Sequence, residues 1–367
     1  MVTSTKPPRN GFVRAARKVY NPIGFGKGYN FVFWLIFGGA LLGFSLSRFP
    51  MLDFYGKFCS KDGEGSPFHA GPGECWYYLR GNHETIGIIM HLAGVIPGSF
   101  LAFFQFVPVI RHKLILFHRV NGYVVLLLSV VGTVGALMIV RHAFGGGLAT
   151  QVSLGLLGIM FTGALLLAYI NVKLLQIEQH RAWMLRAWAY GGCILTIRII
   201  MTVMALIISD QDGYYAPQPC GQIDSMLRGN RTEVLAVFPQ CQSFYSGENP
   251  GQWAIAQANL KTDNDAFSAA ALGTSCGAAA WLALAIHAIG VELYLQLTPA
   301  EHERLRRVSY QRQLEAGMKD PGRGGITVDR FGDAEKWSPP STKVGHGGIS
   351  GQGPPGIAHR IIRLSRC

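Results

Sequence analysis

The composition of this chain excludes a soluble globular protein. It has 367 residues, of which 49% are hydrophobic and only 15% are charged, and the apolar residues gather in several long runs. These proportions are typical of a polytopic membrane protein. A net charge of +12 would suggest a nucleic-acid partner in a soluble protein. In a membrane protein the position of the charges matters more than their sum, and we expect no nucleic acid.

Six apolar runs are long enough to cross a bilayer, which needs about 20 residues per helix. They cover residues 30–48, 85–109, 115–140, 148–171, 183–208 and 267–295. The sequence therefore predicts an all-α bundle of about six transmembrane helices within residues 30–297. Residues 1–29 form a basic N-terminal segment, and residues 209–266 form a long irregular loop. We expect the basic tail, residues 298–367, to be a short helix to about Met318 followed by mostly disordered chain.

The distribution of cations predicts the orientation in the membrane. With both termini in the cytosol, 24 of the 33 lysine and arginine residues lie on that side, as the positive-inside rule requires. Four cysteines then fall in two luminal loops, where disulfides persist: Cys59, Cys75, Cys220 and Cys241. The glycosylation sequon at Asn230 lies in the same compartment. These features predict a multi-pass protein of the secretory pathway, most simply of the endoplasmic reticulum.

A stripe of small and polar residues runs along the second predicted span. Its members recur at three-, four- and seven-residue spacing: Glu84, Gly87, His91, Gly94, Gly98 and Gln105. Small residues let a neighbouring helix approach closely, and polar residues in a span face the bundle interior. Arg198 in the fifth span must also turn inward, and it shares a helix face with His180. We therefore expect an interior polar site built by the second, third and fifth spans.

Acid catalysis on a lipid-embedded small molecule is one use of such a site. A carboxylic acid kept protonated by apolar surroundings can protonate an alkene or open an epoxide. Glu84 is the candidate acid, His91 would tune it, and Arg198 would pair with it or orient it, or bind a polar head of the substrate. His118 and His180 would form the cytosolic edge of the site. This hypothesis calls for no cofactor and no metal.

The histidines support a second hypothesis. Paired histidines on facing transmembrane helices hold haem b, and two layers of them conduct electrons across a membrane, as in cytochrome b561-like proteins. The candidate ligands are His91, His118, His142 and His180. The luminal pair argues against this hypothesis, because His91 lies about two turns inside the second span whereas His142 lies at the very end of the third span. A non-enzymatic transporter or scaffold is a third hypothesis, and the lack of an internal repeat argues mildly against a transporter.

Two motifs resemble those of a known family. The segments Phe117–Tyr123 (FHRVNGY) and Gln179–Arg186 (QHRAWMLR), with an inward histidine on the preceding span, are similar to a broad and largely uncharacterised family of predicted polytopic membrane proteins. The resemblance covers about residues 85–208. Fungal members include membrane-bound terpene cyclases of meroterpenoid pathways. The resemblance therefore implies an isomerase or lyase of secondary metabolism that cyclises a prenylated aromatic or quinone-like substrate by proton transfer, without metal.

The family resemblance does not choose the acid. The assignment of that role to Glu84 rests on the sequence of this chain alone. The histidine motifs fit the haem hypothesis equally well, so haem-b electron transfer stays open as the alternative function. The sequence predicts a membrane-bound cyclase as the main hypothesis.

Overall fold

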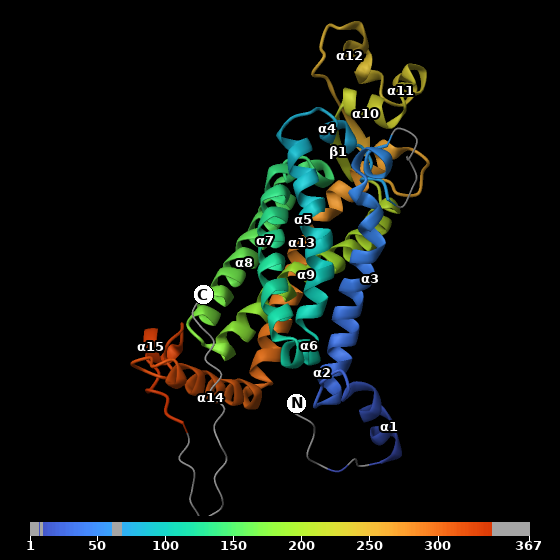
Figure 1. The fold of residues 1–367 in the computed structure, drawn as a ribbon. Helices are drawn as coiled ribbons and strands as arrows, with labels where there is room; N and C mark the ends of the chain where they lie inside the picture. The colour runs from blue at the N-terminus through green and yellow to red at the C-terminus, as the bar shows by residue number, and fades with distance from the viewer. Residues whose placement is uncertain (1–6, 8–9, 61–67, 340–367) are drawn as a thin grey trace, which may run out of the picture.

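The computed structural model describes residues 7, 10–60 and 68–339, and it is a bundle of long helices (Figure 1). Among these described residues, six helical stretches are long and apolar enough to cross a membrane: Gly28–Leu52, His83–Gln105, Ile115–Ile139, Leu148–Lys173, Ile177–Ser209 and Asp265–Gln296. The predicted all-α membrane bundle is therefore confirmed.

The elements of the first half, in chain order, are α1 (Gly11–Tyr20), α2 (Gly28–Phe33), η1 (Trp34–Gly38), α3 (Gly39–Arg48), η2 (Phe49–Leu52), η3 (Phe54–Phe58), α4 (Cys75–Tyr78), α5 (His83–Gln105), α6 (Pro108–Lys113), α7 (Ile115–Ile139), η4 (Ala143–Gly146) and α8 (Leu148–Lys173). Those of the second half are α9 (Ile177–Ser209), β1 (Tyr215–Pro219), α10 (Cys220–Met226), α11 (Arg231–Val237), η5 (Pro239–Cys241), α12 (Gln242–Ser246), β2 (Trp253–Gln257), α13 (Asp265–Gln296), α14 (Pro299–Glu315) and α15 (Val328–Phe331).

Two of the helix boundaries that differ from the predicted spans have local reasons. Helix α9 begins at Ile177 rather than at residue 183, because polar residues such as Glu178 continue a helix without adding to its hydropathy. Helix α5 ends at Gln105 rather than at residue 109. Val107 has an extended backbone and precedes Pro108, the first residue of α6. A proline ring disfavours helical geometry at the residue before it, so α5 ends ahead of Val107.

The bundle has two distinct ends. The disulfide end holds the connections that contain Cys59–Cys75 and Cys220–Cys241, and the tail end holds α6 and α14 (Figure 1). Because α5, α8 and α13 begin at the disulfide end and α7 and α9 finish there, neighbouring helices in the chain run antiparallel. The position of a residue along its helix therefore shows whether the residue lies at the disulfide end or at the tail end of the bundle.

Helices α5 and α7 cross at very close range because glycines face each other. A Cβ atom built on Gly94 would lie 2.5 Å from the backbone nitrogen of Gly132, and one on Gly135 would lie 2.5 Å from the carbonyl oxygen of Gly87. Real Cβ atoms do not approach other atoms that closely. The small-residue stripe predicted on the second span thus packs directly on the backbone of α7.

Helices α8, α9 and α13 form the second packed group. Their shared core contains small and aliphatic side chains, among them Ala187, Ile197 and Ala279. The connection between α8 and α9 is only residues 174–176, so these helices are antiparallel neighbours. His287 ties α13 to α9, with Nδ1 at 2.8 Å from the Ala189 carbonyl oxygen and Nε2 at 2.8 Å from the Thr196 hydroxyl.

The long connection between α9 and α13 is folded rather than irregular. Strands β1 and β2 form an antiparallel pair in which Tyr215 faces Gln257 and Pro219 faces Trp253. Three short α-helices and the η5 turn lie between the strands, and residues of this segment share a buried core with the first turns of α13. The sequence failed to predict this subdomain because a large share of its order depends on the disulfide and on packing against α13, which are non-local.

The tail also differs from the predicted disorder. Helix α14 lies across the tail end, and residues 316–339 return to it and to the turn between α8 and α9 (Figure 1). The glycines at 324 and 325 let the chain pass close to the buried amide side chains of Gln313 and Gln176. A segment whose composition is typical of disorder is therefore ordered here. Residues 340–367, the rest of the predicted disordered tail, lie outside the described residues.

Candidate functional site

Glu84 is a buried carboxylate at the disulfide end of the bundle. It occupies the first turn of α5, and the Asn82 side chain caps that turn by accepting a hydrogen bond from the Glu84 nitrogen at 3.0 Å. Its side chain is 2% exposed. A carboxylate so deeply buried requires a partner, because removing a charge from water is costly.

His142 is that partner. Its Nδ1 atom and the Glu84 Oε1 atom share a hydrogen bond and form an ion pair when the ring is protonated. The imidazole also stacks on the Tyr77 ring, with the ring centroids 3.9 Å apart and the planes 12° from parallel. Because three elements, α4, α5 and the connection after α7, each supply one of these residues, the group is set by the tertiary fold.

The short η4 segment joins a second carboxylate and Arg198 to this region. Phe144 donates its backbone N–H to Glu74 Oε1 at 3.0 Å, and its ring lies 4.5 Å from the Arg198 guanidinium carbon. Phe144 has φ 48°, a left-handed conformation that non-glycine residues adopt at a cost of about 1–2 kcal/mol. The fold therefore holds a strained residue between Glu74 and Arg198.

Tyr78 interacts electrostatically with these charged groups. Its side chain is fully buried, and burial raises the pKa of its phenol well above the ordinary range. The carboxylates of Glu74 and Glu84 raise this pKa further, whereas Arg198 lowers it. Tyr78 consequently stays protonated and can only act as a neutral hydroxyl. We call Glu74, Tyr77, Tyr78, Glu84 and His142, with Phe144 and Arg198 beside them, the Glu84 site.

The structure changes the roles expected for His91 and Arg198. His91 bonds through Nδ1 to the Gly132 carbonyl oxygen at 2.9 Å, so it joins α5 to α7 instead of tuning Glu84. Arg198 stacks on Phe144, and within the described chain it forms no ion pair with a carboxylate. The expectation that Arg198 pairs with Glu84 is therefore not met: His142 occupies that position.

His118 and His180 lie at the opposite end of the bundle from Glu84. The carbonyl oxygen of His118 accepts a hydrogen bond from Gln105, the last residue of α5, at 3.2 Å. Glu84 is about 30 Å away from Gln105 along α5, at about 1.5 Å per residue. The two histidines therefore cannot form the edge of the Glu84 site.

The two tail-end histidines have different surroundings. His118 is supplied by α7 and His180 by α9. His180 Nδ1 is held at 2.9 Å from the Ala168 carbonyl oxygen, and His118 Nδ1 is buried without a hydrogen-bond partner in the described chain. Both residues therefore lie outside the group of residues around Glu84.

Sequence reasoning missed Glu74, Tyr77 and Tyr78, and it assigned His142 only as a possible haem ligand. These residues lie in connections between spans, where no periodicity marks the buried positions. The one available signal for these buried positions was the run of aromatic residues that follows Glu74 and Cys75 in the segment Glu74–Tyr78. Such a segment also fits an ordinary surface loop.

The cysteines pair as Cys59–Cys75 and Cys220–Cys241, with Cα atoms 5.5 Å apart in both bridges. These are the four cysteines expected to be in luminal loops. Cys193 and Cys276 are free and buried inside the spans. Asn230 is exposed, and its side chain caps α11 by accepting from the Glu233 nitrogen at 3.3 Å. The sequon therefore lies on the surface of the folded subdomain at the disulfide end.

Comparisons with known proteins agree with the membrane fold. Residues 88–216 match a family described as "Predicted membrane protein (DUF2306)". The chain is also similar to "Ava biosynthesis cluster protein G" of Aspergillus versicolor, at 24% identity over an alignment of 347 positions that covers 81% of this chain and 97% of that protein. No solved structure matches the chain significantly. The expected resemblance to an uncharacterised membrane family with a member from a fungal biosynthesis cluster is confirmed.

Proposed function

We propose that the protein is a membrane-embedded enzyme of fungal secondary metabolism that cyclises a prenylated substrate by proton transfer at the Glu84 site. The observation that carries this proposal is the buried Glu84 carboxyl paired with His142 against the Tyr77 ring. The similarity to a protein named after a fungal biosynthesis cluster supports a role in secondary metabolism. The family resemblance supports the reaction class.

The chemistry requires one proton that leaves and returns. The hydrogen bond between Glu84 Oε1 and His142 Nδ1 holds a proton between a carboxyl and an imidazole. Transfer of this proton to an alkene carbon, or to an epoxide oxygen, creates a positive charge on carbon that a second double bond of the substrate attacks. Loss of a proton from a neighbouring carbon back to the pair restores it, so the product is an isomer of the substrate.

Aromatic groups at the site suit such a cation. The faces of Tyr77 and Tyr78 carry negative charge density, which stabilises a nearby carbocation. Unlike water, the rings do not form a bond to the cation and quench it. Tyr78 is kept neutral by its raised pKa, so it does not compete as a base. Glu74 supplies a second buried carboxylate whose field favours positive charge in the same region.

Microsomes that contain the full chain provide the test. We expect them to convert a farnesylated phenol or quinone into a product of unchanged mass with fewer double bonds, which mass spectrometry and NMR would detect. Microsomes of the same host without the protein are the control. If the folded protein converts no member of a panel of prenylated phenols and quinones, the proposal is wrong.

Haem b binding at the tail end is a second candidate function, because His118 of α7 and His180 of α9 both lie at that end of the bundle. His180 holds its Nδ1 on a backbone carbonyl, which leaves Nε2 to act as a ligand. Nδ1 of His118 is buried without a hydrogen-bond partner in the described chain, so this ring has a nitrogen free to act as a ligand. Bound haem would supply one-electron transfer, while these residues would hold and orient it.

An absorption spectrum tests the haem candidate. If haem binds, the purified protein should show a Soret band that His118→Ala and His180→Ala both remove, because each variant lacks one of the two imidazoles that would hold the haem. His112→Ala is the matched control, since His112 is exposed on α6. A colourless protein after expression with added haem precursor contradicts this candidate.

The disulfide end, in our proposal, faces the lumen of the endoplasmic reticulum, which places both termini in the cytosol. If so, Asn230 is glycosylated, and treatment with an N-glycosidase increases the mobility of the protein on a gel. Asn230→Gln should abolish this shift. Asn249→Gln should keep it, because Asn249 lies in the same subdomain outside a sequon. A protein without any shift, whose tail is protected from protease in sealed microsomes, has the opposite orientation.

A further inference from the structure

A cavity of about 470 Å³ lies at the tail end, about as large as a small-molecule site. Helix α9 supplies much of one wall, α13 and α14 contribute one residue each, and residues 326–332 of the returning tail close the other side. It lies at the opposite end of the bundle from Glu84. The cavity therefore differs from the site proposed for catalysis, and its role does not depend on that proposal.

The motif Gln179–Arg186, which the Glu84 site leaves unused, lines this cavity. Arg181, Trp183 and Arg186 all face it. Arg186 is neutralised, since its guanidinium donates to both carboxyl oxygens of Glu292 at 2.6 and 2.8 Å. Arg181 contacts the Tyr294 hydroxyl at 3.4 Å, and in the described parts of the chain it forms no ion pair. Arg181 thus brings to the cavity a cation that no direct ion pair neutralises, and the Glu301 carboxylate acts on it only at longer range.

The other walls are largely apolar. Leu295, Val328 and Phe331 line the cavity together with Trp183, whereas no acidic residue lines it within the described chain. His302 adds a polar group, and burial lowers the pKa of its imidazole, with Arg181 and Arg306 adding to this and Glu178 and Glu303 opposing it. A ligand that suits these walls has an anionic head for Arg181 and an apolar body for the remaining surface.

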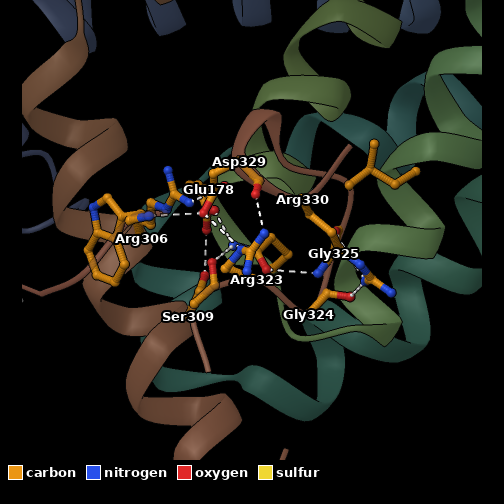
Figure 2. A network of polar contacts seen from close by, with 12 residues as sticks. Glu178, Arg306, Ser309, Arg323, Gly324, Gly325, Asp329 and Arg330 are labelled. Atoms are coloured by element: carbon orange, nitrogen blue, oxygen red, sulfur yellow. Dashed lines mark hydrogen bonds and ion pairs between the residues drawn. The ribbon is translucent and has the colours of Figure 1, made fainter. Parts of the chain in front are cut away.

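A network of buried polar contacts fastens the tail wall (Figure 2). Ser309 of α14 donates to Glu178 at 2.5 Å, and Arg306 donates to Asp329 at 2.5 Å. Gly325 donates its backbone N–H to the buried Gln176 side chain at 2.9 Å. A Cβ atom on Gly325 would lie 2.4 Å from the Gln176 Cβ, so only glycine fits there. The wall is therefore held in one position, as a preformed site requires.

We propose that this cavity binds the phosphate head of an amphiphile, with Arg181 contacting the phosphate and Trp183 and Phe331 contacting the apolar body. Arginine is suited to this role because its planar guanidinium binds phosphate oxygens in pairs. The ligand is a membrane phospholipid or a soluble prenyl phosphate, since both combine a phosphate with an apolar chain. The cavity lies where α9 starts, before the apolar run at 183–208, and lipid head groups lie at the ends of such runs.

Binding to the purified full chain tests the proposal in two arms. In the lipid arm, native mass spectrometry of detergent-solubilised protein measures retention of dioleoyl phosphatidic acid against dioleoyl phosphatidylcholine. In the soluble arm, farnesyl diphosphate is titrated into protein in phosphatidylcholine nanodiscs, and thermal stabilisation reports the dissociation constant. Preferential binding in the first arm identifies a lipid site, and saturable binding in the second identifies a prenyl phosphate site.

The Arg181→Gln variant should weaken binding by about tenfold or more, because it removes a charge-assisted contact. Arg181→Lys should restore part of the affinity, since it returns the charge without the planar pair of donors. Val328→Trp is expected to block the cavity without altering charge, and Val328 is exposed enough to accept the larger ring. Arg312→Gln, on the exposed face of α14, is the matched loss of one cation and should have little effect.

Two results would overturn the proposal. One is the lack of binding in both arms by a protein whose thermal unfolding is normal. The other is an equal loss of affinity in Arg181→Gln and Arg312→Gln, which would mean that overall positive charge, not the cavity, attracts the phosphate. Turnover of prenylated substrates at the Glu84 site is unaffected by either result, so the two proposals can fail separately.

Discussion

Replacing Glu84 by glutamine should lower the turnover number for a prenylated substrate by at least about a hundredfold, because general acid–base catalysis contributes about 10²–10⁴-fold. Glutamine keeps the size of the side chain and can still bond to His142, but it cannot deliver a proton. Initial rates in microsomes, normalised to the amount of folded protein, measure the effect. His83→Gln is the control, since His83 is the exposed neighbour of Glu84 at the start of α5.

A purely structural Glu84–His142 pair would give a different result. Removing one member of a buried pair leaves an uncompensated polar group, which destabilises a protein by about 3–5 kcal/mol. In that case Glu84→Gln would lower the thermal midpoint in proportion to its loss of activity. If turnover falls while the midpoint stays within the range of the His83→Gln control, the pair is catalytic. Unchanged turnover contradicts the proposal.

Substitutions of His142 and His91 separate the observed partner of Glu84 from the expected one. His142→Gln should reduce turnover and change its dependence on pH, because it removes the imidazole that shares the proton of Glu84. His91→Gln should leave the pH profile unchanged, since His91 bonds to the Gly132 carbonyl oxygen. If only His91→Gln altered the pH profile, His91 rather than His142 would be the residue that tunes Glu84, as the sequence predicted.

The Gly94→Val substitution should have the largest effect on stability. The first added carbon alone would lie 2.5 Å from the Gly132 nitrogen and 2.6 Å from the Leu128 carbonyl oxygen, so α5 and α7 must separate. Overpacking costs about 1–3 kcal/mol where side chains can move, and backbone atoms move less readily. We therefore expect a loss of about 3 kcal/mol or more, seen as a much lower thermal midpoint in detergent and as aggregation.

Gly163→Val is the matched control for this effect. Gly163 lies in α8, and a Cβ atom added there would have no neighbouring atom within 4 Å. Both substitutions place the same β-branched residue in a transmembrane helix, so their intrinsic helix propensities change equally. The difference between the two midpoints then measures the helix contact alone. Equal midpoints would show that α5 and α7 do not pack through Gly94.

The membrane architecture could be predicted from the sequence because a bilayer imposes local requirements. Each span needs about 20 apolar residues whatever its neighbours are, so the spans are visible in composition alone. The stripe that contains Gly87 and Gly94 was equally local, because close helix contact requires small residues at regular spacing. The two folded connections and the ordered part of the tail could not be found in this way.

Local patterns along the chain were enough to specify six spans, the face of α5 that meets α7, and an inward-facing acid at Glu84. The histidine that pairs with this acid became evident only in the folded chain, because His142 follows Glu84 by 58 residues and reaches it through the turn after α7. Tertiary packing also placed Arg198 on Phe144 and separated His118 and His180 from the site. Periodicity states which face of a helix a residue occupies, whereas the depth, tilt and connections of the packed helices determine which residues meet.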